Sequence, residues 1–154
     1  MVHHLTFNSI KQIHDKSIEE NEDDRCERPE DIYFSIDFVK DYVKRDLYKQ
    51  SLGYCISLIV LHPFKEGNHR TSLYSAIIFL ILNKNISDPS VESVKSIQEW
   101  RTRDIDKDNY ALKREFFRIT CIENNDDLRK KEILKIMNSN YGITIEKWLR
   151  KYCK

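Results

Sequence analysis

The sequence predicts an all-α fold, a compact bundle of about seven helices around a central buried helix. Only three Gly and three Pro occur in 154 residues, so few residues interrupt a helix. Apolar residues recur at helical spacing in nearly every segment. About 40% of the residues are apolar and 33% are charged, a balance typical of one globular domain. We therefore expect a single domain over residues 1–154.

The first half of the chain predicts three helices and then the central one. The first carries Ile10, Ile13 and Ile18 and precedes a polar loop at residues 19–24. The second begins near Pro29, which suits a first helical turn. Its apolar stripe comprises Ile32, Ile36, Val39, Val43 and Leu47. The third turns Leu52, Cys55, Ile56, Ile59 and Val60 inward. Residues 73–82 are apolar on all sides, which predicts the central, buried helix.

The second half is less regular. Asp88 and Pro89 predict the next helix start, with Asp88 as the cap and Pro89 in the first helical position. Charged residues dominate 100–108, which favours an exposed loop or a solvated face. Amphipathic stripes then return around Phe116, Leu134 and Trp148.

Charge and hydropathy exclude several classes of protein. The 26 basic and 25 acidic residues nearly cancel, so no overall field attracts nucleic acid or an anionic membrane. The longest apolar run, 76–82, is far shorter than the roughly 20 residues of a membrane span, and the N-terminus has no signal-peptide core. The four cysteines form no CxxC pair, so we expect them to be reduced and structural. We expect a cytoplasmic protein without nucleic-acid or membrane partners.

The chemistry is concentrated in the polar loop at residues 62–70, between two very apolar helices. Pro63 stops a helix, Gly67 permits a positive φ, and the next helix begins around Asn68. The first N–H groups of that helix then form an anion site. Three side chains complete it. Arg70 offers a cation for phosphate, Glu66 an oxygen ligand for Mg²⁺, and His62 a proton acceptor. These are the components of phosphate transfer.

Each residue alone has a simpler interpretation. A lone His62 is more often a core or cap residue, Glu66 a cap acid and Arg70 a surface cation. Their order in one loop favours the catalytic interpretation. His14 has no such neighbours, and we interpret it as a side chain on a helix surface.

The loop resembles the signature of the Fic/Doc family, which His62, Phe64, Glu66, Gly67, Asn68 and Arg70 match in spacing. The resemblance covers residues 5–85 and leaves 86–154 as a helical C-terminal extension. It implies the Fic fold, with room for a small β-hairpin flap. It also implies the site roles: His62 as general base, Phe64 as loop anchor and Glu66 as the metal ligand. Nucleotide phosphates would lie against Gly67, Asn68, His69 and Arg70.

The implied activity is transfer of AMP or a phosphoryl group from a nucleotide, ATP with Mg²⁺, to a Ser, Thr or Tyr hydroxyl of a target protein. His69 stands where adenylyltransferases have a second Gly, and Leu73 where they have a second Arg. Both departures are similar to the Doc branch, whose members are toxins neutralised by an antitoxin. AMP and phosphoryl transfer both stay open. The alternatives are a catalytically degenerate Fic-fold interaction module and, less favoured by the charge balance, a nucleic-acid binder.

Some Fic proteins carry an inhibitory helix with a Ser or Thr, three intervening residues, and Glu followed by Gly or Asn. Ser17 with Glu20-Asn21, and Thr120 with Glu123-Asn124, are each one residue short. We expect no built-in inhibitor and expect control by a separate partner.

Overall fold

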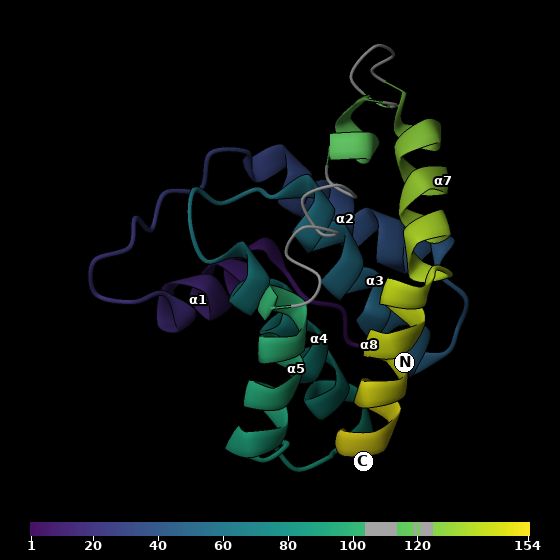
Figure 1. The fold of residues 1–154 in the computed structure, drawn as a ribbon. Helices are drawn as coiled ribbons and strands as arrows, with labels where there is room; N and C mark the ends of the chain where they lie inside the picture. The colour runs from purple at the N-terminus through teal and green to yellow at the C-terminus, as the bar shows by residue number, and fades with distance from the viewer. Residues whose placement is uncertain (104–113, 119, 121–124) are drawn as a thin grey trace.

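The computed structural model describes residues 1–103, 114–118, 120 and 125–154, and these residues form an all-helical chain (Figure 1). Seven helices are bounded: α1 Phe7–Ser17, α2 Pro29–Tyr42, α3 Leu47–Leu61, α4 Asn68–Lys84, α5 Val91–Arg103, α7 Asp126–Met137 and α8 Asn140–Tyr152. Residues 114–118 and 120 are also helical. The predicted all-α class is confirmed. None of the described helices has the length and apolar character that crossing a membrane would require.

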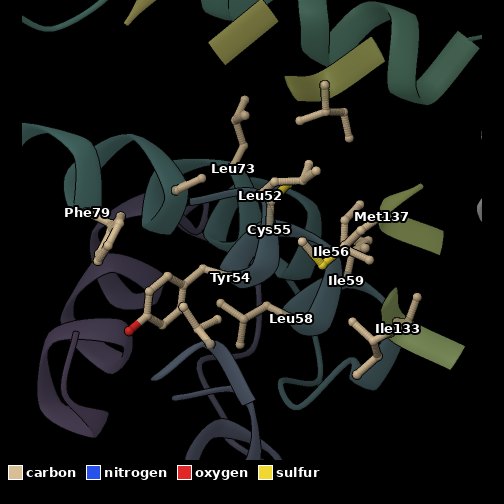
Figure 2. Packing of buried hydrophobic residues seen from close by; sticks show 14 of the residues in the cluster. Leu52, Tyr54, Cys55, Ile56, Leu58, Ile59, Leu73, Phe79, Ile133 and Met137 are labelled. Atoms are coloured by element: carbon tan, nitrogen blue, oxygen red, sulfur yellow. The ribbon is translucent and has the colours of Figure 1, made fainter. Parts of the chain in front are cut away.

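Helix α3 is the centre of the bundle. Every residue from Gln50 to Leu61 is buried, and α2, α4, α7 and α8 all pack against this helix. Figure 2 shows α3 side chains, among them Cys55 and Ile56, between Leu73 of α4 and Met137 of α7. Helix α1 lies at the edge of the bundle, against α4 (Figure 1). The C-terminal helices α7 and α8 therefore share one apolar core with the N-terminal helices.

Helix α4, predicted to be the central helix, is less enclosed than α3. Its inner face, including Leu73 and Phe79, is buried, but Leu82 is 53% exposed and Tyr74 and Ile78 are only partly buried. An apolar pattern on all sides is also compatible with a helix that lines a cavity on one side. The prediction of a central, buried helix at residues 73–82 therefore holds for one face of α4 and is wrong for the other.

Two helix boundaries also differ from the prediction. Helix α2 ends at Tyr42 and Leu47 begins α3, so the predicted stripe is divided between two helices. Helix α5 begins at Val91, not at Pro89. The Ser93 N–H donates to Ser90 Oγ at 3.1 Å, so the capping side chain is Ser90 rather than Asp88.

The β-hairpin flap implied by the family resemblance is not found in the described residues, which contain only an isolated antiparallel bridge between Cys26 and Phe64. Residues 25–28 bond to the loop after α3 instead of to a second strand of their own. The N–H groups of Glu27 and Arg28 both donate to Pro63 O, and Lys65 N–H donates to Arg25 O. These bonds join residues 25–28 to the loop after α3.

The charged segment 100–108 is only partly as expected. Trp100 and Arg101 belong to helix α5, and Arg101 is 0% exposed, so the expectation of a solvated face is wrong there. Residues 104–108, and Glu123 and Asn124 of the second inhibitory pattern, lie outside the described residues.

Candidate active site

The loop between α3 and α4 is shaped by two residues with positive φ. His62 ends α3 in the left-handed region, with φ 55°, and Gly67 precedes α4 with φ 82°. Pro63 prevents α3 from continuing between them. The chain reverses sharply, so α4 returns along α3 and its N-terminus lies at the loop.

Asn68 and Phe64 hold the loop closed. Asn68 Oδ1 accepts from the Phe64 N–H at 3.0 Å, and Asn68 Nδ2 donates to the Phe64 carbonyl at 2.7 Å. Phe64, which the sequence predicts as the loop anchor, is 1% exposed. Both polar atoms of the Asn68 side chain are engaged in this closure. The backbone N–H of Asn68, in the first turn of α4, can still donate to an anion.

His14 contacts the loop from α1, and the expectation of a surface side chain is wrong. It is 0% exposed, and its ring stacks on the Phe64 ring with centroids 3.8 Å apart. Its Nε2 donates to the Glu66 carbonyl at 2.7 Å. The available signal was its spacing: His14 follows Ile10 by one helical turn and so lies on the apolar stripe of α1.

Gly67 packs against the C-terminal end of α1. A Cβ on this residue would lie 2.7 Å from Ile18 Cγ2, and a positive φ is strained for other residues. The close approach of residues 14–18 and the left-handed backbone both require glycine here.

A cavity of about 1040 Å³ opens beside the loop. One end is polar and contains every predicted catalytic, metal and phosphate residue, namely His62, Glu66, Gly67, Asn68, His69 and Arg70. The other walls come mainly from α4 and α5 and carry both apolar and polar side chains. The apolar ones are Tyr74, Ile77, Ile78, Val91 and Val94, and the polar ones include Lys95, Gln98 and Glu99. The structure therefore brings the predicted site residues together. The cavity is as large as the pockets that hold whole small-molecule ligands.

The polar end has two donor groups suited to an anion. Helix α4 runs for 17 residues, and in the described part of the chain no side chain caps its start at Gly67. Its first N–H groups and its dipole favour a negative charge there. Arg70 Nε is buried and has no hydrogen-bond partner among the described residues.

Carboxylates of the acidic segment 19–24 engage Arg70. Its Nη2 donates to Glu22, and its Nη1 lies 3.3 Å from Glu19 Oε1. Glu22 also lines the cavity. The backbone N–H of Glu19, which donates to the Glu22 carboxylate, and the Arg70 guanidinium both lower the pKa of Glu22. The sequence indicated only a polar loop here, whereas the structure places carboxylates on the predicted phosphate-binding cation.

The donors for a metal are few. Among the described residues, no group of three or more His, Cys, Asp or Glu side chains is arranged to hold an ion. Glu66 lines the cavity, and one of its carboxylate oxygens accepts the Asp23 N–H. Mg²⁺ is commonly bound through one or two carboxylates together with substrate phosphates and water. A single Glu66 therefore fits Mg²⁺ that arrives with a nucleotide.

Comparison with known proteins adds one finding. The sequence model of the Fic/DOC family matches residues 2–80, which include α1, α2, α3, the loop and most of α4. No curated protein and no solved structure matches the chain. The matched region covers just over half of the 154 residues and contains the whole loop at the polar end of the cavity. The chain belongs to the Fic/DOC family.

Proposed function

We propose that this protein transfers AMP or a phosphoryl group from a nucleotide, ATP with Mg²⁺, to a Ser, Thr or Tyr hydroxyl of a target protein. One observation carries the proposal. His62, Glu66 and Arg70 line one cavity with the uncapped start of α4, inside the region that matches the family.

The two ends of the cavity suit the two parts of a nucleotide. Phosphates fit the polar end, where the α4 amides and Arg70 supply donors. A flat, largely apolar base fits the wall formed by Tyr74 and Ile78 of α4 and Val94 of α5. Lys95 and Glu99 at the same wall offer polar contacts that can distinguish one base from another.

The reaction is a displacement at phosphorus. His62 accepts the proton of the target hydroxyl, the hydroxyl oxygen forms a bond to phosphorus, and the bond to the leaving group breaks. The leaving group is pyrophosphate if AMP moves and ADP if a phosphoryl group moves. Arg70 and the α4 amides hold the phosphate oxygens in place. Glu66 would hold Mg²⁺, which neutralises phosphate charge when bound.

The choice between the two transfers depends on how the triphosphate lies. Leu73, at the position of the second Arg of adenylyltransferases, is 0% exposed and faces the core rather than the cavity. His69 adds a bulky side chain at the polar end. Both features favour the Doc-like alternative, a cytoplasmic toxin that phosphorylates its target and is held in check by an antitoxin.

Labelled ATP tests the proposal. The protein is incubated in a cell lysate with ATP carrying a label at either the α or the γ phosphorus, and we expect one of the two labels on a target protein. His62→Ala should lower labelling by about 10²- to 10⁴-fold because the general base is lost. His3→Ala, an exposed histidine remote in sequence, is the control. Equal labelling by the His62→Ala and unmodified proteins would show that His62 is not the base.

The Arg70 contacts favour one alternative, a non-catalytic interaction module. Arg70 is already engaged by Glu19 and Glu22, so carboxylates compete with phosphate for the cation. Calorimetry of ATP with Mg²⁺ distinguishes the two functions. Saturable binding at the cavity supports the transferase, and no binding at millimolar ATP supports the module.

A further inference from the structure

We propose that Arg101 is a positioning residue for the phosphate-binding end of the cavity. It belongs to α5, in the part of the chain beyond the 2–80 family match, and bonds to the first turns of α4. Its effect on nucleotide binding rests on the proposed function; its effect on the shape of the loop does not.

The contacts of Arg101 are concentrated on one short stretch of α4. Nη1 donates to the His69 carbonyl at 3.0 Å, and Nη2 donates to Ser72 Oγ at 2.8 Å. The Ser72 hydroxyl in turn donates to the His69 carbonyl at 2.8 Å. These three bonds form a closed set around the start of the helix. His69 lines the cavity, so its backbone is fixed at the point where an anion would be held.

The same guanidinium also bonds to α8 and to a side chain of its own helix. Arg101 Nε donates to Tyr141 OH of α8 at 3.2 Å, and Nη1 also donates to Gln98 Oε1 at 3.1 Å. The planar fork of arginine can make these bonds in several directions at once, which a lysine ammonium on a flexible stem cannot reproduce. One side chain therefore ties α4 to both α5 and α8.

Burial makes a purely packing role a poor explanation. Arg101 is 0% exposed, and burying a cation is costly unless its donors are well satisfied. An apolar side chain would fill the same space without that cost. A cation beside the first turns of α4 also adds to the positive end of the helix dipole. The Arg101 cation and the positive end of the α4 dipole repel each other. An anion bound in the cavity offsets this repulsion, so the arrangement favours phosphate.

The experiment compares Arg101→Lys, which keeps the charge, with Arg101→Met, which keeps much of the volume. Tyr141→Phe is the matched control, because it removes the bond to α8 and leaves the bonds to His69 and Ser72. The first readout is amide hydrogen exchange at residues 71–74, whose N–H groups bond to the first turn, as Thr71 does to Gly67 O. The second is the Kd for ATP with Mg²⁺.

We expect exchange at 71–74 to be about tenfold or more faster in both Arg101 variants, with α7 amides unchanged, because charge-assisted bonds are lost. ATP affinity should fall by a similar factor, and Tyr141→Phe, which keeps the bonds to His69 and Ser72, should have a smaller effect than either Arg101 variant. Unchanged exchange and affinity in Arg101→Met would overturn the proposal, as would equal effects of Tyr141→Phe.

Failure of Arg101→Met to fold and absence of ATP binding by the unmodified protein lead to different conclusions. If Arg101→Met does not fold, Arg101→Lys and Ser72→Ala provide the same comparison at smaller cost to packing, and unchanged exchange in both overturns the proposal. If the unmodified protein binds no ATP, the proposed function fails, while the exchange rates still decide whether Arg101 positions the loop.

Discussion

His14 links α1 to the loop through its ring face and one nitrogen. The ring packs on Phe64, and Nε2 donates to the Glu66 carbonyl. His14→Phe keeps an aromatic ring but leaves that carbonyl without its donor. We expect a loss of about 1–3 kcal/mol in the free energy of unfolding, the cost of an unsatisfied buried polar group. Urea unfolding measures it, with exposed His3→Ala as control. Unchanged stability would contradict the role given to His14.

At this scale, adjacency in sequence decides what is predictable. His62, Glu66 and Arg70 stand in one loop, so their convergence follows from local order. His14 lies 52 positions from Glu66, and Arg101 lies 32 positions from His69. Their contacts depend on how whole helices pack. The residue type alone does not predict that packing. A charged residue such as Arg101 would be predicted to lie on the surface, whereas it is buried.

The acidic segment between α1 and α2 acts on the site through Glu22. Glu22→Gln removes the carboxylate that pairs with Arg70. Because partly exposed ion pairs contribute up to about 1 kcal/mol, we expect the affinity for ATP with Mg²⁺ to rise a few-fold, up to about fivefold. Calorimetry measures the change. Glu20→Gln, an exposed neighbour, should have no effect. Equal affinities for the Glu22 and Glu20 variants would show that the contact does not restrain Arg70.

Asp46 stands directly before helix α3, caps its start and also binds α8. Its Oδ1 accepts from the N–H groups of Tyr48 and Lys49, and its Oδ2 accepts from Arg150 Nη2 at 2.9 Å. Burial alone would raise the pKa of Asp46, but the bonds from Arg150 and the backbone outweigh it and the pKa is lowered.

A lowered carboxyl pKa gives stability that is full above the ordinary value and is lost as pH falls through the lower one. Asp46→Asn keeps the cap and loses the ion pair, and the pair is worth little because both partners are about 41% exposed. We expect Asp46→Ala to lose about 1 kcal/mol more than Asp46→Asn. Thermal unfolding between pH 7 and 2 should show an Asp46→Asn deficit that is constant above about pH 4 and shrinks as the pH falls below it. A deficit independent of pH would exclude the ion pair.

Helix existence was easier to predict than helix ends. Apolar periodicity extends over many residues of each helix, whereas the start of a helix depends on one capping residue. Asp88 and Ser90 are both suitable N-cap residues and lie two positions apart. Ser90 forms the bond to the Ser93 N–H, and the helix begins after it.

The whole chain should unfold as one unit if the C-terminal helices belong to the same domain. Leu149 of α8 is 0% exposed in the core that α3 occupies. Leu149→Ala should lower the free energy of unfolding by about 2–5 kcal/mol. We expect the same loss by tryptophan fluorescence, from Trp100 and Trp148, and by hydrogen exchange of α3 amides. Lys147→Ala, exposed on the same helix, is the control. Unaffected α3 amides would indicate a separate C-terminal domain.

The fold class follows from composition, because few glycines and prolines leave helices uninterrupted. The burial order of the helices does not follow. In α3 the apolar residues pack against other helices, whereas in α4 some of them line a cavity. The same residue types occur in both places, so the sequence does not distinguish them. The family resemblance likewise left room for a small β-hairpin, whereas the described residues contain only the isolated bridge between Cys26 and Phe64.

The cavity has walls of different origin. The loop after α3 carries His62 and Glu66 and lies, together with most of α4, inside the family match, whereas α5 lies beyond it. Under the proposed function, proton removal and base selection are thus encoded by separate stretches of the gene. Exchanging α5 residues such as Val94 or Lys95 offers a way to retune which nucleobase is accepted while the reacting groups stay untouched.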